Sequence, residues 1–346
     1  MGLPPGIPFE DYRRDVAQLT EAERALQREF EGWFPPVVID AHVHNALLDH
    51  VLSVPERSLR HMASSFPWRT VEESRRLHPV LFPGAEVRCL RFAHAHPGID
   101  HPAVNRWLSA TLEGSRDRFA VFGLQCDPTW TLAEIARFRP AALKMYYMVT
   151  EPPGTTITEV FPSGVLRECE RRHIPIILHL PRQITESVAE VCEVADRFAD
   201  LPIVLAHLGV PNFMRPGLED AYRRVARRRN IYMDTACMEY ADIAELAIRV
   251  LGSDRIIFGT DDPISLLRVN PYWHPTKGPR VVPPAPMHWT DPAEFREFGH
   301  LGGGALMNHW QQLVALRAAF RRFGETELAI RQQVMYDNAA RLYGFN

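Results

Sequence analysis

The stretch "VVIDAHVHN" (residues 37–45) carries the strongest structural signal in this 346-residue chain. Apolar or small residues lead into Asp40, and two histidines, His42 and His44, then stand one residue apart. Side chains at positions i and i+2 of an extended strand point to the same face, so both imidazoles are expected to converge on one point. The stretch therefore predicts a buried strand that ends in two convergent histidines, with Asp40 as a supporting residue.

Seven further apolar runs follow, and each is separated from the next by enough sequence for a crossover helix. Near-continuous Val, Ile and Leu runs are typical of parallel strands covered by helices. A doubly wound sheet is disfavoured because no GxGxxG follows the first strand. Eight strands alternating with helices predict an α/β fold of the (β/α)8 TIM-barrel type. The eight runs are residues 37–44, 86–94, 119–125, 141–147, 174–180, 202–209, 231–237 and 256–263.

Two segments depart from this alternation. Residues 1–36 are predicted to form an N-terminal helical extension, whose helix starts at a capping box of Thr20 and Glu23. Residues 264–304, which contain many prolines and glycines, are predicted to form a long irregular insertion after the eighth strand that serves as a lid. The barrel domain is expected to span residues 37–346 and to close with two helices, over 305–323 and 325–343.

The composition limits the class of partner and the compartment. A net charge of −3 gives no overall attraction to nucleic acid or to an acidic membrane surface, so a small-molecule substrate is expected. The five cysteines are odd in number and contain no CxxC pair, which is typical of a reducing compartment. No secretory leader or bilayer-length apolar run is present, and the protein is predicted to be cytoplasmic. Assembly of the chain into a homo-oligomer is compatible with the sequence, which contains no feature that decides it.

Polar residues gather at the carboxyl ends of the predicted strands, where barrel enzymes build their sites. Each of these residues, taken alone, could be an ordinary hydrogen-bonded residue. Together they stand at corresponding heights of one barrel, which favours a shared site. Neutral imidazoles and carboxylates suit zinc and other first-row divalent ions, and a bound cation activates water. No GxSxG motif supports a serine mechanism. The set comprises His42, His44, Lys144, His179, His207 and Asp261.

With these motifs in order, the chain resembles the amidohydrolase superfamily, in its amidohydrolase 2 branch of aminocarboxymuconate-semialdehyde-decarboxylase-like, metal-dependent TIM-barrel enzymes. The resemblance covers residues 37–346. It implies that Asp261 and His207 are catalytic, with Asp261 as the general base, and that the metal residues are His42, His44, His179, His207 and Asp261. The matching motifs are "IDAHVH" (39–44), "ILH" (177–179), "LAHLG" (205–209), "FGTDDP" (258–263) and "DNAARLYGF" (337–345).

The resemblance leaves the number of metal ions open. In binuclear members a carboxylated lysine of the fourth strand bridges two ions, and Lys144 stands on that strand. Mononuclear relatives, including decarboxylases of the aminocarboxymuconate type, are alike in the other motifs. The alternative for Lys144 is a lysine that only pairs with a carboxylate, a substrate or a metal ligand. We expect one or two divalent ions, zinc first, with iron or manganese as alternatives. Asp234 is either support for the metal ligands or an ordinary hydrogen-bonding residue.

The resemblance implies a metal-dependent hydrolase that acts on an amide, lactone, ester or thioester. The alternatives are a mononuclear, nonoxidative decarboxylase or hydratase, which is a lyase, and a catalytically silent metal-binding barrel. Substrate contacts are predicted from Arg91, His94, Tyr146 and Arg182, which lie on or just after the strands. Because arginine presents a planar fork of donors that suits a carboxylate, an anionic group on the substrate is expected.

Overall fold

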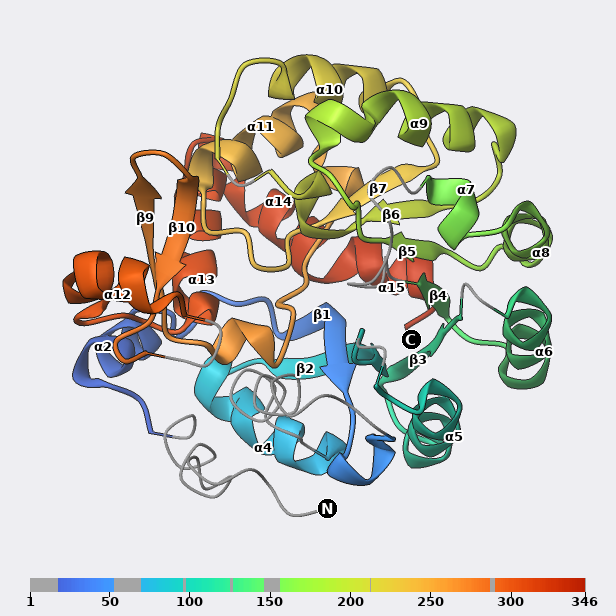
Figure 1. Ribbon diagram of the computed structural model, residues 1–346, viewed down its shortest axis with the longest axis horizontal. Coiled ribbons are helices and arrows are strands. Elements are labelled where there is room, and N and C mark those ends of the chain that lie inside the picture. The colour runs from blue at the N-terminus through green and yellow to red at the C-terminus, as the bar shows by residue number, and fades with distance from the viewer. Residues whose placement is uncertain are drawn as a thin grey trace.

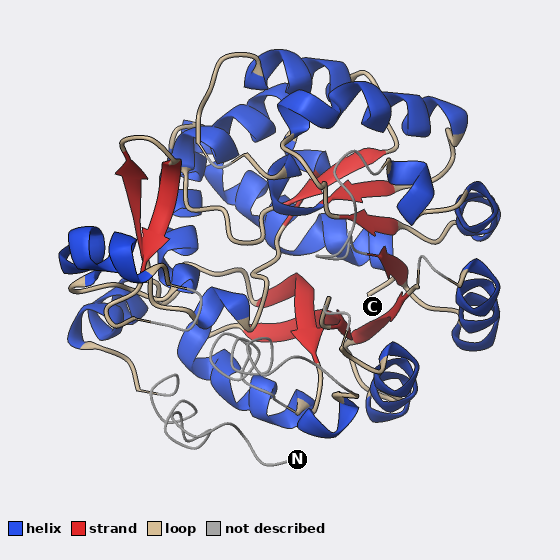
Figure 2. Cartoon of the chain, in the orientation of Figure 1, coloured by secondary structure: helices blue, strands red, loops and turns tan. Residues whose placement is uncertain are grey.

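A computed structural model describes residues 18–52, 70–95, 98–124, 127–145, 156–211, 213–286 and 290–345. Eight parallel strands are hydrogen-bonded in sequence order and alternate with helices (Figures 1 and 2). This arrangement confirms the predicted TIM barrel. The strands are β1 (Val37–Asn45), β2 (Glu86–Ala93), β3 (Arg118–Phe122), β4 (Ala142–Met145), β5 (Ile176–Leu178), β6 (Ile203–Leu205), β7 (Ile231–Asp234) and β8 (Ile256–Ile257).

The barrel closes between β1 and the segment that follows the short strand β8. Ala41 N–H donates to Phe258 O at 3.0 Å, and Asp261 N–H donates to His42 O at 2.9 Å. His44 N–H then donates to Asp262 O at 2.7 Å. Main-chain bonds between two segments that lie far apart in the sequence therefore fix the predicted metal residues of the first and eighth strands against each other.

The helices cover the outside of the barrel (Figure 1), and each has an apolar face at helical spacing. On α10, for example, Leu218, Ala221, Tyr222 and Val225 are buried. The outer helices are α4 (Val71–Leu81), α5 (His101–Thr111), α6 (Pro128–Phe138), α7 (Ile157–Val160), α8 (Ser163–Arg172), α9 (Ile184–Arg197), α10 (Leu218–Ala226), α11 (Ala241–Leu251), α13 (Asn308–Arg321), α14 (Glu327–Gln332) and α15 (Asn338–Tyr343).

The predicted N-terminal helix is α2 (Glu21–Glu29), and its capping box is present: Glu23 N–H donates to Thr20 Oγ1, and Thr20 N–H donates to the Glu23 carboxylate. The same buried carboxylate accepts from Arg268 and from Met307 N–H. Phe30, which follows α2, packs against Trp310 of α13 with ring centroids 6.3 Å apart. The described part of the extension is therefore attached to the C-terminal part of the chain, whereas residues 1–17 lie outside the described residues.

The insertion after β8 is more regular than the sequence indicates. It contains an antiparallel pair, β9 (Asn270–His274) and β10 (Gly278–Val282), followed by α12 (Pro292–Phe298). Figure 1 shows this hairpin beside the barrel. The expectation of an irregular segment is thus wrong for these residues, because the turn residues Pro275 to Lys277 allow the chain to fold back on itself. Residues 287–289 lie outside the described part, and the lid role stays a prediction.

The second closing helix is interrupted. A π-helical turn at Gln333–Asp337 separates α14 from α15, and Val334 O accepts from Phe258 N–H at 2.9 Å. A π turn commonly frees a main-chain group for such a contact. Arg118, at the start of β3, donates to Gly344 O, which places the end of α15 at the amino ends of the strands, opposite the predicted metal residues.

Among the described residues, none of the helices combines the length and apolar character needed to cross a bilayer.

Candidate metal centre

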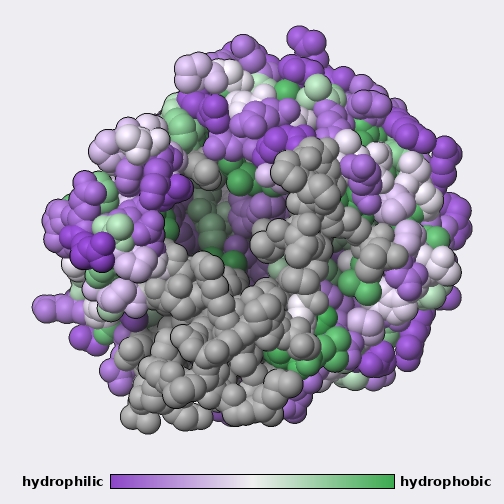
Figure 3. All heavy atoms as spheres, in the orientation of Figure 1, coloured by the Kyte–Doolittle hydropathy of each residue, from purple (hydrophilic) through white to green (hydrophobic). Residues whose placement is uncertain are grey.

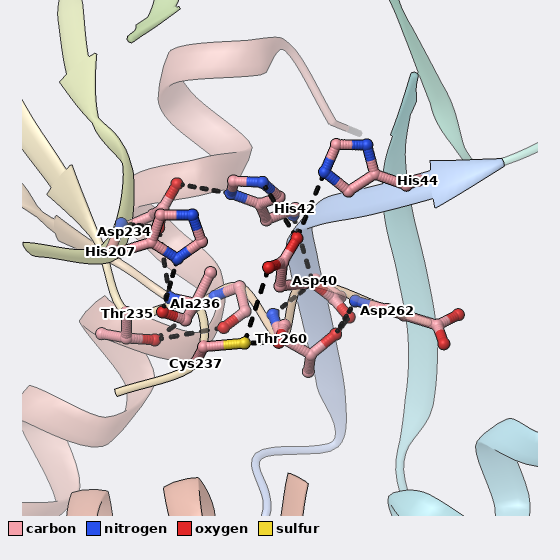
Figure 4. Close-up of polar contacts among 12 residues, drawn as sticks. Asp40, His42, His44, His207, Asp234, Thr235, Ala236, Cys237, Thr260 and Asp262 are labelled. Carbon is pink, nitrogen blue, oxygen red and sulfur yellow. Dashed lines mark hydrogen bonds and ion pairs between the residues drawn. The ribbon is translucent and has the colours of Figure 1, made fainter. Parts of the chain in front are cut away.

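Strand β1 is irregular at the point where its histidines begin. The register of its pairing with β2 shifts between Asp40 and Val43. Asp40 is turned towards the segment after β8, where its carboxylate accepts from Thr260 N–H at 2.9 Å and from Thr260 Oγ1 at 2.5 Å. Figure 4 shows this contact beside the two histidines. Asp40 therefore joins the two segments that close the barrel, and burial raises its pKa to about 7.

Three predicted ligands form a compact buried cluster. One ligand atom from each of His42, His44 and Asp261 lies within 4.8 Å of the others. Asp261 Oδ1 is 3.4 Å from His42 Nε2 and 3.2 Å from His44 Nε2. Each of the three residues is 7% exposed or less. Two imidazoles and a carboxylate thus face one another in a region shielded from water.

The histidine rings are oriented by acceptors behind them. His44 Nδ1 is 2.9 Å from Ala93 O, and His207 Nδ1 is 2.9 Å from Ala236 O. A carbonyl can only accept, so each Nδ1 must carry the proton and each Nε2 presents a lone pair. Acceptors that fix the tautomer in this way are the usual surroundings of metal-binding histidines.

Asp234 orients His42 in the same way. Its Oδ2 is 2.9 Å from His42 Nδ1, and its Oδ1 accepts from His207 N–H at 2.8 Å and from Ala236 N–H at 3.1 Å. Burial opposes ionisation of Asp234, but the neighbouring His42 and His207 lower its pKa to about 2. Figure 4 shows the Asp234 carboxylate joined to the His42 ring, with the His207 ring beside them. Of the two interpretations left open by the sequence, these contacts favour support for the ligands.

The remaining two predicted histidines extend the cluster. The His207 ring lies 5.1 Å from the His42 ring and 5.0 Å from the His179 ring, measured between centroids. His207 itself has a left-handed backbone, with φ 55°, at the end of β6. Left-handed non-glycine residues are costly and concentrate at functional sites. The turn therefore directs this ring towards the other histidines instead of continuing the strand.

Asp261 also has a left-handed backbone, with φ 68°. Burial by itself raises the pKa of this carboxyl, but His42, His44 and His207 outweigh it and hold the pKa well below its usual range. The second oxygen, Oδ2, accepts from Cys237 Sγ at 3.5 Å. Asp261 is therefore an ionised, buried carboxylate among imidazoles.

Lys144 is fully buried on β4, beside the cluster. Its Nζ lies 5.4 Å from the centre of the Phe92 ring, and that ring packs against both His42 and His44. Burial lowers the pKa of Lys144 to about 8, against the opposing influence of Asp234 and Asp261. A lysine with this pKa has a substantial neutral fraction near neutral pH, which is the form that reacts as a nucleophile.

The donor set fits a divalent cation. Burial lowers the pKa of His42 to about 4 and that of His179 well below its usual value, so both rings are neutral at pH 7, as ligands must be. Within the described part of the chain, His42 Nε2 and Asp261 Oδ1 are buried and make no hydrogen bond of good geometry. Orphaned buried polar atoms call for an explanation, and a coordinated ion provides one.

The predicted substrate residues do not all reach this centre. Arg91 faces outwards, because its neighbours Leu90 and Phe92 fill the barrel interior and side chains alternate along a strand. Its guanidinium is fully buried and contacts Asp117 at 2.8 Å, as well as Asn45 and Ser74. The prediction that Arg91 binds substrate is therefore wrong: it is the partner of a buried ion pair.

The other substrate predictions differ in outcome. The His94 ring is stacked on that of His44, with centroids 5.4 Å apart and planes within 3°. Arg182 lies after β5 with a side chain 37% exposed, 3.9 Å from Glu190 of α9. Tyr146 lies outside the described residues. The structure therefore brings His94 next to the cluster and leaves Arg182 at the surface beyond β5.

The sequence analysis missed two residues that support the centre. Thr260 binds the Asp40 carboxylate, and its place inside the "FGTDDP" motif was an available signal. Gln312 of α13 contacts the main chain at the ends of β7 and β8. Nothing local marks Gln312, because it is one of two consecutive glutamines in an amphipathic helix.

Buried histidines and an aspartate at the strand ends of a TIM barrel define the class of barrel enzymes with a metal centre at the carboxyl face. Within that class, the chain belongs to the amidohydrolase family: the family model Amidohydro_2 matches residues 39–345. The family is metal-dependent, in agreement with the His42, His44 and Asp261 cluster. The family resemblance expected from the sequence motifs is thereby confirmed.

Solved structures show the same fold. The 5-carboxyvanillate decarboxylase LigW of Sphingomonas paucimobilis has a TM-score of 0.59 at 14% identity, over 90% of this chain and 100% of that one. A zinc-bound amidohydrolase of Burkholderia multivorans scores 0.57 at 14% identity, with the same coverage. A putative 2-pyrone-4,6-dicarboxylic acid hydrolase of Pseudomonas putida scores 0.54 at 17% identity, over 90% and 99%. No curated protein matches the chain.

Proposed function

We propose that this chain is a metal-dependent hydrolase that uses water to cleave a carbonyl-type bond, namely an amide, lactone, ester or thioester, in a small carboxylate-bearing substrate. The observation that carries the proposal is the position of Asp261. Its buried carboxylate stays ionised and lies within 3.4 Å of the Nε2 atoms of both β1 histidines. A carboxylate in contact with the ligand set is placed within reach of a water bound there, which is the geometry that a proton acceptor needs.

The residues that would hold a cation are His42, His44, His179, His207 and Asp261. When bound, a zinc, iron or manganese ion lowers the pKa of a coordinated water and polarises a carbonyl oxygen. The chain itself keeps the rings of His42 and His44 fixed through the acceptors on Asp234 and Ala93. Such fixed surroundings place the ligands before the ion arrives.

Two residues of the centre have catalytic roles in this proposal, and Asp261 is the one that moves protons. Asp261 accepts the proton of the attacking water and passes it on to the leaving group. His207, whose Nδ1–H is fixed by Ala236 O, presents Nε2 on the more exposed side of the cluster. In this proposal His207 acts through that Nε2 lone pair, as a residue that would hold the cation beside the departing group, and the proton that the departing group takes up comes from Asp261.

Lys144 bears on the number of ions. Burial lowers the pKa values of His42 and His179, and the positive charge of the buried Lys144 amine lowers them further, so the amine lies near both rings. We favour a binuclear centre, in which Lys144, once carboxylated by CO2, would help to hold both ions. The lowered pKa, about 8, supports this because the neutral amine is the form that combines with CO2.

The substrate has access from the face that carries the loops. Figure 3 shows this face hollowed beside the β9–β10 hairpin, with both hydrophobic and hydrophilic surface inside the hollow. His94 stacks on His44 at the cluster, and Arg182 lies on the loop after β5. We propose that these two residues contact a small, anionic substrate.

The test combines metal analysis with a substrate panel. Protein purified with zinc, iron or manganese is assayed against lactones, amides, esters, thioesters and carboxylated aromatics, with hydrolysed product and CO2 measured in parallel. We expect hydrolysed product without CO2, and a loss of about 10²- to 10⁴-fold in Asp261→Asn. CO2 release without hydrolysed product would establish the lyase alternative instead.

Asp262→Asn is the matched control, because this neighbouring carboxylate contacts Ser74 Oγ at 3.1 Å instead of the histidine cluster. We expect this variant to retain its metal and most of its turnover. A folded wild-type protein that binds no metal refutes the proposal. A metal-loaded protein with no turnover on the whole panel favours the silent barrel.

A further inference from the structure

The strands that carry the two carboxylates of the centre stop pairing just before the site. The β7–β8 ladder ends at the pair Asp234 and Ile257, and Thr235 N–H donates to Ile257 O at 3.0 Å. Beyond this bond the two segments are joined by longer contacts. Thr235 Oγ1 lies 3.4 Å from both Gly259 N and Gly259 O, and Cys237 Sγ lies 3.7 Å from Thr260 O and 3.5 Å from Asp261 Oδ2. The main-chain carbonyl of Thr235 accepts from Met238 N–H at 3.0 Å, and that of Gly259 accepts a long bond of 3.4 Å from Thr235 Oγ1. Because a carbonyl oxygen has two lone pairs, each can take one further donor.

Gln312 of α13 supplies that donor. Its side chain is fully buried, and Nε2 lies 2.8 Å from Thr235 O and 2.7 Å from Gly259 O. Both partners are carbonyl oxygens, so the amide must direct its NH2 group towards them and both hydrogens are used. One side chain from a helix outside the barrel thus holds the ends of two neighbouring strands at a fixed separation.

The two bonded carbonyls adjoin residues of the metal centre. Thr235 directly follows Asp234, whose carboxylate orients His42. Gly259 precedes Asp261 by two residues and lies against His42, since a Cβ built on Gly259 would be 2.7 Å from His42 Cβ. A change in the separation of the two strand ends would therefore move Asp234 and Asp261 relative to the ring between them.

We infer that Gln312 is a positioning residue of the metal centre, which sets Asp234 and Asp261 at their distances from His42. The inference rests on the proposed metal-dependent function. It gives α13 a part in the centre although the helix contributes no ligand. It also explains why a polar side chain is fully buried in a helix whose other inward residues are mainly apolar, among them Trp310, Leu313 and Leu316.

The neighbouring glutamine provides a matched control. Gln311 Nε2 also donates to two main-chain carbonyls, Val269 O at 2.6 Å and Leu306 O at 3.0 Å. These carbonyls lie on either side of the β9–β10 insertion, away from the β7 and β8 ends. The two side chains therefore have the same chemistry on the same helix, and only Gln312 is joined to the metal centre.

The experiment compares Gln312→Met with Gln311→Met, since methionine keeps the length of the side chain and removes its donors. Metal-free protein is titrated with Co²⁺ against a chromogenic chelator, and the visible absorption of bound cobalt is recorded together with the Tm of the metal-free form. We expect both variants to lower the Tm. Only Gln312→Met should weaken cobalt binding, by about 10- to 100-fold, and alter the cobalt spectrum.

Cobalt affinity and spectrum equal to those of wild type in folded Gln312→Met would overturn the inference while leaving the proposed function intact. Wild-type protein that binds no cobalt would overturn both. If Gln312→Met does not fold, Gln312→Asn takes its place, because the shorter amide reaches only one of the two carbonyls. A partial loss of cobalt affinity in that variant supports the inference, and wild-type affinity refutes it.

Discussion

Gly259 offers the sharpest test of how closely the metal centre is packed. A Cβ at this position would lie 2.7 Å from His42 Cβ and 3.3 Å from His42 N. The first distance is about 0.8 Å short of a comfortable carbon–carbon contact of about 3.5 Å. Rotation of the imidazole cannot relieve it, because both His42 atoms are fixed by the main chain of β1. The backbone of Gly259 is not left-handed, so alanine is opposed by this contact alone.

We therefore expect Gly259→Ala to displace His42 or to separate β1 from the segment after β8. Overpacking of a well-packed interior costs about 1–3 kcal/mol, and the free energy of unfolding should fall by that amount. Catalytic and binding groups must be held within about 0.5 Å, so a shift of this size should also weaken metal binding, by about tenfold or more. Urea unfolding gives the first quantity, and titration of metal-free protein with zinc gives the second.

Gly164→Ala is the control for the substitution itself. Gly164 lies in α8, and a Cβ there would meet nothing within 4 Å. Alanine should stabilise that helix by about 0.5–1 kcal/mol and leave metal binding unchanged. If Gly259→Ala binds zinc as tightly as wild type and unfolds at the same urea concentration, then β1 and the β8 segment are not packed as described, and the reasoning from this contact fails.

Three further substitutions test other parts of the structure. Asp234→Asn weakens the acceptor of His42 Nδ1–H and should reduce zinc affinity about 10- to 100-fold without unfolding the protein. Lys144→Ala should lower the metal content from two ions per chain to one, and a single ion in active wild-type protein would contradict the binuclear proposal. Arg91→Met removes the buried partner of Asp117 and leaves it with the more exposed Arg75, which should cost about 3 kcal/mol and leave KM unchanged. Burial raises the pKa of Asp117, but Arg91, together with Cys89 N–H and Arg75, outweighs it, so the folded pKa lies below 3.8. The stabilisation from these contacts is therefore present above pH 3.8 and lost as the pH falls through the folded value, and urea unfolding should find this dependence weakened in Arg91→Met.

Much of the barrel could be predicted because its signals are local. Apolar runs such as residues 174–180 and 202–209 carry the strand pattern within a few residues, and helical spacing marks the segments between them. The strand-end histidines followed from the same reasoning, since the carboxyl ends of all parallel strands meet at one face. The convergence of these histidines could be predicted from the order of strands and helices alone, and that order can be read from the sequence.

Predictions for single side chains were weaker wherever direction mattered. Arg91 was expected near the substrate because it lies on β2, but alternation along the strand turns it outwards to Asp117. Asp40 is directed to Thr260 by a register shift in β1 that no residue of the motif announces. In both cases a change of one position along a strand reverses the face on which a side chain lies.

The sequence by itself thus determined the type of fold, the order of its strands and which residues stand at the strand ends, because periodicity and motif spacing are properties of short segments. Only the tertiary structure decided how those residues are held. The acceptors behind the histidines, the closure of the barrel between β1 and the segment after β8, and the bridge from Gln312 to Thr235 and Gly259 join parts of the chain that are distant in sequence. Such contacts depend on packing and on the pairing of buried polar groups, which no local pattern encodes.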